Sequence, residues 1–393
     1  MSEGPSGVLE APAHRRHTLG DRQGGSGPTM IVMTGLHGNE PAGGRAARRV
    51  LARLEREGLE INGRFVVLAG NLRALAAGIR FLDCDLNRQW TQERVAELQN
   101  QALNDAEATE QRELLAAIRE VANQSTGPVY FLDLHTTSAV GPPFVTVGDT
   151  LRNREFARSF PLPLIFGLEE QVDGALLEYL NNFGLITLGA EAGQHDCDRS
   201  VDRLEALMWL ALRSAGLLAP DAVEGRVYAG VLREASRGVP RVIEVRYRHA
   251  IDDQDGFEML PGFHNFAPVE KGQVVARDRN GPIHARESGL ILLPLYQGKG
   301  EDGFFIARPL RTFWLYLSAF LRRFRIGAFL HWLPGVHCSR DQRLELTIDT
   351  RIARWYPLEV FHLFGYRKRR RTGDTLIVTR RAFDSNEPET TRL

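Results

Sequence analysis

The sequence predicts an α/β protein over its first half, and two observations lead to this class. Apolar runs alternate with stretches of helical periodicity from Thr29 to about residue 218, which is the pattern of strands and helices in turn. Several of the apolar runs are followed directly by His, Glu or Arg, as expected where open α/β sheets bind ligands at strand ends. With 393 residues the chain is long enough for two or three domains and a sizeable core.

The first predicted element is a buried strand over Met30–Thr34, which leads through a glycine turn into a helix over Pro41–Glu57. Proline is tolerated at the first helical position because its missing N–H would have no partner there. The following strands are expected over Arg64–Ala69, Val129–Leu134, Phe144–Val147, Leu162–Phe166 and Leu185–Ala190. The following helices are expected over Gln92–Val121 with a break near Asn104, Gly174–Phe183 and Ser200–Ala215.

The pattern of the sequence changes near Pro220, where short strand-like runs separated by glycines begin. Turn residues at this spacing indicate a small β domain. Its strands are expected over Arg226–Leu232, Arg241–Tyr247, Gly272–Asp278 and Gly289–Pro294. The prediction therefore divides the chain into a disordered leader (1–27), a catalytic domain (28–220), a small β domain (221–310) and an α+β C-terminal extension of unknown role (311–393).

The extension begins with two aromatic, apolar segments, Phe313–Leu321 and Ile326–Leu333, with Arg322, Arg323 and Arg325 between them. No apolar run reaches the roughly 20 residues that span a bilayer, so no transmembrane segment is predicted. Docking of these segments onto the protein's own core is favoured over an interfacial membrane helix. The basic run Arg367–Arg371 is favoured as a solvated turn between two strands over a contact with nucleic acid.

The composition is that of an ordinary globular protein, with 25% charged residues and a formal net charge of zero. This balance does not call for nucleic acid or a membrane as a partner. The cysteines Cys84, Cys197 and Cys338 lie far apart without a CxxC spacing, which suits a reducing compartment. The first 27 residues lack the apolar core of a signal peptide, and a cytoplasmic location is expected.

The residues that follow two of the strands have the chemistry of metal ligands. His37 and Glu40 stand three apart after the first strand, and His135 follows the strand Val129–Leu134 at the matching position. If these strands are neighbours, both imidazoles emerge at one edge of the sheet. Two His and one Glu then form a tripod with an open fourth position, as a catalytic zinc ion requires. Glu191, at the end of the sixth strand, could act as a general base beside a zinc-bound water.

Further polar residues leave more than one interpretation open. Arg80 and Arg88 flank an Asp-rich segment, and an arginine fork suits an anionic substrate; composition alone favours pairing between these Arg and Asp side chains at the surface. Asp133 either orients a ligand histidine or is a buried structural residue. A rival metal constellation consists of His195, Cys197 and Asp198, and it is less favoured because no fourth ligand at a recognised spacing lies nearby.

Taken together, these motifs resemble the succinylglutamate desuccinylase/aspartoacylase family of zinc hydrolases, which are related to the metallocarboxypeptidases. The motifs that carry the resemblance are Gly35-Leu36-His37-Gly38-Asn39-Glu40, Arg80 with Asp83-Cys84-Asp85-Leu86-Asn87-Arg88, Asp133-Leu134-His135, and Glu191-Ala192-Gly193. The resemblance covers roughly residues 28 to 310. It implies a mixed sheet sandwiched by helices, as in zinc carboxypeptidases, followed by a small β domain.

The resemblance also implies the chemistry of the site. One zinc ion per chain would be held by His37, Glu40 and His135. Arg80 would help to stabilise the oxyanion, and Glu191 would act as the acid/base. The substrate-binding residues would be Asn87 and Arg88, which would hold a substrate carboxylate.

The function expected from this resemblance is hydrolysis of the amide bond of a small N-acyl amino acid or related N-acyl amine. The sequence departs from the better-known members at Gln194–Asp198, which does not match the substrate-contacting residues of aspartoacylase, and at Glu178–Leu188, which lacks a further substrate-binding Arg. The acyl group and the amine are therefore not specified. The alternatives are a metallocarboxypeptidase acting on peptide C-termini and a non-catalytic zinc-binding interaction protein; a homo-oligomer is left open.

Overall fold

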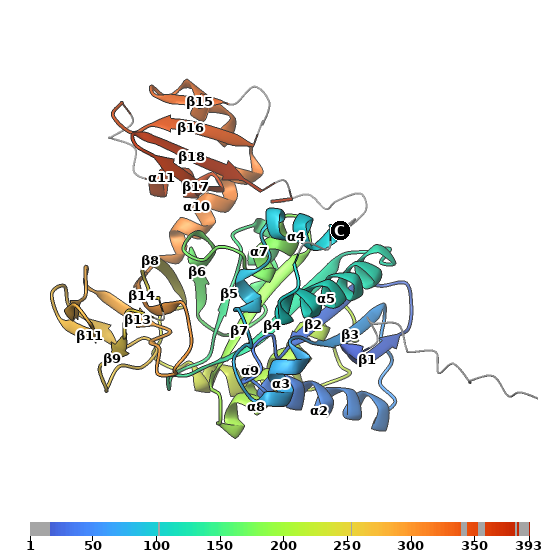
Figure 1. Ribbon diagram of the computed structural model, residues 1–393. Coiled ribbons are helices and arrows are strands. Elements are labelled where there is room, and N and C mark those ends of the chain that lie inside the picture. Colours follow the sequence, from blue (N-terminus) through green and yellow to red (C-terminus); the bar gives the residue numbers. More distant parts are fainter. Residues whose placement is uncertain are drawn as a thin grey trace, which may run out of the picture.

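The computed structural model (Figure 1) describes residues 16–100, 103–252, 254–338, 344–352, 358–381, 383–384 and 393. Within these residues an 11-stranded mixed sheet has the order β1-β3-β2-β4-β7-β5-β6-β8-β14-β13-β10. Its strands are β1 (Thr18–Gln23), β2 (Thr29–Thr34), β3 (Arg64–Ala69), β4 (Val129–Thr137), β5 (Phe144–Thr146), β6 (Leu164–Phe166), β7 (Ile186–Gln194), β8 (Val242–Ala250), β10 (Pro268–Val269), β13 (Gly289–Leu292) and β14 (Asp302–Pro309).

Strand β2 lies in the parallel centre of this sheet. It pairs with β3 on one side and with β4 on the other, parallel to both, and β4 pairs parallel with β7. Every residue of β2 is buried, as is typical of parallel strands that are covered by helices on both faces. The carboxyl ends of β2, β4 and β7 therefore meet at one edge of the sheet.

Alternate side chains of β2 enter two different cores because successive residues of a strand point to opposite faces. Met30 and Val32 pack with helices α2 (Ala42–Arg56) and α8 (Asp198–Ser214) on one face. Ile31 and Met33 pack with α5 (Ala106–Asn123) on the other, and Figure 1 shows these helices on opposite sides of the sheet. The other helical segments around the sheet are α3 (Leu72–Ala77), η1 (Leu86–Arg88), α4 (Gln92–Gln99), α6 (Leu151–Ala157), η2 (Leu168–Glu170), α7 (Leu176–Asn181) and α9 (Gly225–Ala235).

Two smaller sheets complete the described fold. A three-stranded sheet is formed by β9 (Glu258–Met259), β11 (Val274–Asp278) and β12 (Gly281–His284). The C-terminal extension contains a four-stranded sheet, seen at the top of Figure 1. The elements of the extension are α10 (Thr312–Arg323), η3 (Ile326–Trp332), β15 (Val336–Cys338), β16 (Glu345–Asp349), α11 (Leu358–Leu363), β17 (Tyr366–Thr372) and β18 (Thr375–Arg380).

The α/β class and the mixed sheet between helices are confirmed, and most predicted strands and helices of the first half lie within a few residues of their expected bounds. The strand expected over Arg226–Leu232 is wrong, because this segment lies in helix α9. Tyr228 and Leu232, four residues apart, pack on the core, while Val227 is 55% exposed. This is the spacing of a helix face, and the β-branched and aromatic residues concealed it.

Two further expectations need correction. The leader does not extend to residue 27, because β1 pairs antiparallel with β3 and His17 before it is fully buried, with its Nδ1 2.8 Å from the carbonyl oxygen of Ala69. Residues 1–15 lie outside the described residues. The basic run Arg367–Arg371 lies within strand β17 and is not a turn. The division of the chain at residues 220 and 310 stays a prediction.

Candidate active site

The turn after β2 carries His37 and Glu40 and packs closely on the start of α3. Gly35 has a φ of +64°, which glycine adopts without the penalty that a Cβ brings. A Cβ at Gly38 would overlap the backbone of Ala74 and Leu75. The small residues therefore let the turn lie against α3, and they direct His37 and Glu40 toward the edge of the sheet where β4 ends.

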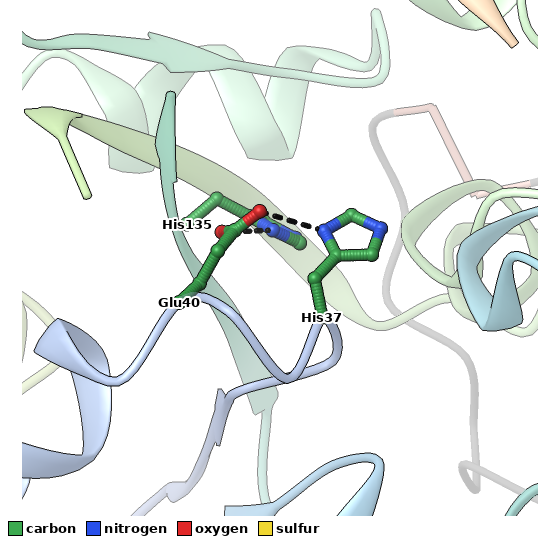
Figure 2. A group of neighbouring side chains, drawn as sticks. All are labelled: His37, Glu40 and His135. Atoms are coloured by element: carbon green, nitrogen blue, oxygen red, sulfur yellow. Dashed lines mark hydrogen bonds and ion pairs between the residues drawn. The ribbon is translucent and has the colours of Figure 1, made fainter. Parts of the chain in front are cut away.

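The structure brings His37, Glu40 and His135 together at this edge, and we call these three residues the tripod (Figure 2). The two carboxylate oxygens of Glu40 lie 2.8 Å from His37 Nδ1 and 3.2 Å from His135 Nδ1. All three side chains are buried, and one ligand atom from each lies within 4.8 Å of the others. Two imidazole nitrogens and a carboxylate facing one point are a donor set that suits a divalent metal such as zinc.

Each histidine of the tripod has a buried aspartate at its outer nitrogen. His37 Nε2 lies 3.1 Å from Asp85 Oδ1, and His135 Nε2 lies 2.9 Å from Asp133 Oδ2. A carboxylate at this position fixes the orientation and tautomer of a ligand histidine. Both Nδ1 atoms are thereby left to face Glu40. The role of Asp85 was missed from the sequence, although Asp85 stands in the Asp-rich segment between Arg80 and Arg88.

The charges of the tripod are strongly coupled. Burial raises the pKa of Glu40, but His37 and His135 outweigh it and hold the pKa of that carboxyl well below its usual range. Burial lowers the pKa of His135, but Asp133 and Glu40 outweigh it and raise the pKa well above the usual value. The buried carboxylates thus favour positive charge at the centre, which a metal cation would also supply.

Glu191 lies beside the tripod because β7 is paired in register with β4. The Cα partner of Glu191 in the ladder is His135. Burial is the main cause that raises the pKa of the Glu191 carboxyl. Within the described part of the chain, its buried Oε2 has no hydrogen-bond partner. A buried carboxyl with an unused oxygen next to the tripod can accept or donate a proton there.

Arg80 also reaches the tripod, through a shared contact with Asp85. Its Nε and Nη2 donate to Asp85 Oδ2 at 3.2 and 2.9 Å, and its Nη1 lies 3.7 Å from Glu40 Oε1. The Arg–Asp pairing that composition favoured is thus present, but the side chain of Arg80 is only 14% exposed and lines the pocket. The guanidinium therefore lies where it can donate to a polar group bound beside the tripod.

Asn87 and Arg88 line the same pocket, but each already has partners within the protein. Asn87 Oδ1 accepts from the backbone N–H of Leu176 at 3.0 Å. Arg88 Nη2 donates to Asp302 Oδ2 at 2.5 Å. An anionic group at Arg88 would therefore share the guanidinium with Asp302 or displace it.

The pocket above the tripod has a volume of about 180 Å³. Its lining includes residues of the segment 293–301, which connects β13 to β14, and Asp302 at the start of β14. Gln297 in this segment accepts from Asn39 Nδ2 at 2.9 Å and lies 3.2 Å from His195 Nε2. Gln297 was missed from the sequence, because nothing in its local pattern indicates a contact with the turn after β2.

The rival constellation of His195, Cys197 and Asp198 does not form a cluster in the described structure. His195 lines the pocket, and its Nδ1 lies 2.7 Å from Thr136 Oγ1. Asp198 is exposed and accepts from Arg45 at 2.8 Å. The aspartate is thus engaged at the surface, and His195 belongs to the pocket of the tripod.

Comparisons with known proteins agree with this geometry. Residues 26–208 match the sequence model of the succinylglutamate desuccinylase/aspartoacylase catalytic domain. A succinylglutamate desuccinylase of Burkholderia pseudomallei is 28% identical over 260 residues, covering 64% of this chain and 70% of that protein. A probable aspartoacylase of Prochlorococcus marinus is 35% identical over 125 residues, covering 31% of this chain and 39% of that protein.

Solved structures share the fold. A succinylglutamate desuccinylase/aspartoacylase from Rhodobacter sphaeroides has a TM-score of 0.55 at 18% identity, covering 74% of this chain and 88% of the other. The product-bound ectoine utilization protein from Ruegeria pomeroyi has a TM-score of 0.54 at 19% identity, covering 74% and 87%. The match shows that residues 26–208 are a catalytic domain of the succinylglutamate desuccinylase/aspartoacylase family, whose names are those of deacylases, and the solved structures share its fold.

Proposed function

We propose that this protein is a zinc-dependent deacylase that hydrolyses the amide bond of a small N-acyl amino acid or related N-acyl amine. The observation that carries the proposal is the meeting of His37, Glu40 and His135 with Glu191 in one small, buried pocket. Three protein ligands favour a catalytic over a structural metal site, because structural zinc sites are normally closed by four.

His37, Glu40 and His135 would hold one zinc ion per chain. When bound, the ion would act as a Lewis acid and lower the pKa of a water molecule from 15.7 in bulk toward 7. Glu191 would accept the proton of the attacking water and then donate it to the leaving nitrogen. Its raised pKa suits both steps, since the same carboxyl must take up a proton and release it.

Arg80 would stabilise the negative charge that develops on the carbonyl oxygen. Its guanidinium is held by Asp85 and reaches toward Glu40, so the donor is already oriented before the substrate binds. One preorganised donor of this kind is typically worth about 3–4 kcal/mol of the activation barrier. Asn87 and Arg88 would bind a substrate carboxylate, with Asp302 as the competing anion on Arg88.

The size of the pocket supports a small substrate over a peptide. A volume of about 180 Å³ lies below the roughly 300–1,000 Å³ of pockets that enclose drug-sized ligands. The names of the curated relatives, succinylglutamate desuccinylase and probable aspartoacylase, describe removal of an acyl group from an amino acid. The metallocarboxypeptidase alternative would need an open groove for the peptide.

The test is a screen of zinc-loaded protein against N-acetyl and N-succinyl amino acids and C-terminal dipeptides, together with metal analysis. We expect release of a free amine from one class of N-acyl amino acid, loss of that activity with a chelator, and its recovery with zinc. Cleavage of dipeptides alone would overturn the substrate class. Hydrolysis that persists after complete metal removal would overturn the metal dependence.

The role of Glu191 is tested by Glu191→Gln, which keeps the shape of the side chain and removes its proton chemistry. We expect kcat to fall by about 10²-fold or more, with zinc still bound at one ion per chain. The matched control is Glu301→Gln, an exposed carboxylate that lines the same pocket, which should retain most of kcat. Full activity of Glu191→Gln would contradict the acid/base assignment.

A further inference from the structure

Helix α10 packs on the protein with a polar face. Ser318 and Arg322, four residues apart, are buried at 2% and 1% exposure. Ser318 Oγ donates to the carbonyl oxygen of Leu363 at 2.8 Å, and Arg322 Nη2 donates to Asp149 Oδ2 at 2.7 Å. Arg322 Nη1 also lies 3.3 Å from Asp384 Oδ1. The face of α10 that meets the protein therefore combines Leu315, which packs on the main core, with buried polar groups, in place of the usual apolar stripe.

The opposite side of α10 is aromatic and exposed. Phe313, Tyr316, Phe320 and Phe324 recur at the spacing of one helix face and are 61%, 65%, 54% and 66% exposed. Trp314, packed against Phe313, is 42% exposed. We call these five residues the aromatic face. The prediction that this segment docks onto the protein's own core is supported by Leu315, which packs on the main core, but the residues of α10 that are most deeply buried are Ser318 and Arg322.

The segment after α10, η3, also exposes aromatic side chains. Helix η3 packs against α10 and exposes Phe329 at 54% and Trp332 at 72%. Solitary exposed apolar side chains are normal on a protein surface, whereas a contiguous apolar patch marks an interaction site. The aromatic face and its neighbours in η3 therefore indicate a partner.

The segment that carries the aromatic face has charged residues of one sign only. From Gly303 to Arg340 the sequence contains no Asp or Glu. Arg311, Arg323 and Arg325 are exposed, and none of them has an ion-pair partner among the residues that the structure describes. Many other exposed arginines do have one, such as Arg45 with Asp198. The rim of the aromatic face is thus positive and complements a negatively charged partner.

We propose that the aromatic face binds the surface of an anionic lipid bilayer. Helices that lie in the bilayer interface combine Trp, Phe and Leu on one side with Arg or Lys at the border, and Trp and Tyr rings favour the headgroup level. None of the described helices is long and apolar enough to cross a membrane. The proposed contact is peripheral, with the rings of α10 among the headgroups and Arg311, Arg323 and Arg325 at the phosphates.

A second copy of the chain is a less suitable occupant. In a two-fold contact each side presents the same surface to the other, so the unpaired Arg323 and Arg325 of one copy would face the positive rim of its partner. Like charges at an interface disfavour association. A bilayer with anionic lipids instead offers negative charge to every arginine at once. A bilayer surface is also deformable, so it can contact the helix along its whole length.

The test is co-sedimentation of the full chain with phosphatidylcholine vesicles that do or do not contain about one third phosphatidylglycerol. We expect binding to the anionic vesicles that weakens with salt, and little binding to pure phosphatidylcholine. Phe320→Ser/Phe324→Ser should abolish sedimentation. Arg311→Glu/Arg323→Glu should reduce the partition coefficient by about fivefold or more for each arginine.

The matched controls are Val227→Ser and Arg226→Glu, which change an exposed apolar residue and an exposed arginine on α9 and should leave vesicle binding unchanged. Tryptophan fluorescence offers a second readout in the variant Trp332→Phe/Trp355→Phe. This variant keeps Trp314 together with Trp90 and Trp209, which are buried, so that a change on vesicle binding reports on Trp314. Its emission should shift to the blue with anionic vesicles. Absence of vesicle binding would overturn the proposal. So would a dimer that forms without lipid and is lost in Phe320→Ser/Phe324→Ser.

Discussion

At the scale of single residues, the tripod depends on the two aspartates behind its histidines. Asp85 is hydrogen-bonded to the outer nitrogen of His37, and Asp133 lies 2.9 Å from that of His135; both aspartates are buried. The orientation of the His37 imidazole is therefore fixed before any ligand binds. Asp85 has a second function in the chain, because it accepts from the backbone N–H of Asn87 at 2.9 Å and so begins helix η1.

We predict that Asp85→Asn weakens metal binding by about 10- to 100-fold, because the outer partner of a ligand histidine sets its basicity and orientation. Zinc affinity is measured by competition with a chromogenic chelator. The control is Asp83→Asn, an aspartate of the same segment that accepts from the backbone N–H of Ala106, outside the pocket. Equal zinc affinity of Asp85→Asn and the parent protein would show that Asp85 does not support His37.

At the scale of elements, the turn after β2 is tested by glycine replacement. In Gly38→Ala the new Cβ would overlap the backbone of Ala74 and Leu75, so we predict a loss of at least about 2 kcal/mol in the free energy of unfolding. Gly44→Ala in α2 is the control, since its Cβ would meet no atom closer than 3.6 Å and alanine in a helix should stabilise by about 0.5–1 kcal/mol. Denaturant unfolding measures both, and a neutral Gly38→Ala would contradict the close packing.

His362, a half-buried residue of helix α11, lies close to two glutamates, Glu170 of η2 and Glu244 of β8. His362 Nε2 lies 3.2 Å from Glu170 and Nδ1 3.5 Å from Glu244. Burial lowers the pKa of His362, but the two glutamates outweigh it and raise the pKa to about 9. A histidine with a raised pKa in the folded state stabilises the protein fully below its unfolded pKa of about 6.5 and ceases to do so as the pH rises.

We therefore predict that the stability contributed by His362, at most about 3 kcal/mol, is lost between pH 6.5 and 9. Unfolding in urea across this range should show a decline for the parent protein that is much smaller for His362→Gln. His331→Gln, at an exposed histidine on η3, is the control and should keep the decline. Parallel profiles for His362→Gln and the parent protein would count against the ion pairs.

At the scale of the whole molecule, the extension is joined to the catalytic part by buried charges. Arg322 of α10 and Arg367 of β17 both pair with Asp149, and Arg381 after β18 pairs with Glu178 of the pocket wall. Polar contacts of this kind are costly to break once buried. The extension is thus fixed to residues that line or adjoin the candidate active site.

We predict that Arg322→Ala lowers the free energy of unfolding by about 3 kcal/mol, because it removes one partner of a buried ion-pair network. Arg323→Ala, the next residue of the same helix, is exposed and should change stability by less than about 0.5 kcal/mol. Chemical unfolding followed by circular dichroism compares the two. Similar values for both variants would contradict the buried network.

The sequence predicted the parts of this molecule whose signals are local. The strand Met30–Thr34 is apolar throughout, and the turn with His37 and Glu40 and the helix after Pro41 follow within a dozen residues. Asp85 lies 48 residues from its partner His37, and Asp149 lies 173 from Arg322, so no local pattern reveals either pair. The orientation of α10 was not predicted, because its apolar and aromatic residues are spread around the helix and do not say which side meets the protein.

The register between β4 and β7 has a consequence for how such a catalyst could diversify. Because His135 and Glu191 are opposite one another in a backbone ladder, the sheet itself sets the spacing between the proposed metal ligand and the proposed acid/base. The segment 293–301, by contrast, lines the pocket as a connection between two strands, and such a connection can change in length and composition. The distance between His135 and Glu191 is therefore expected to stay constant where the connection varies.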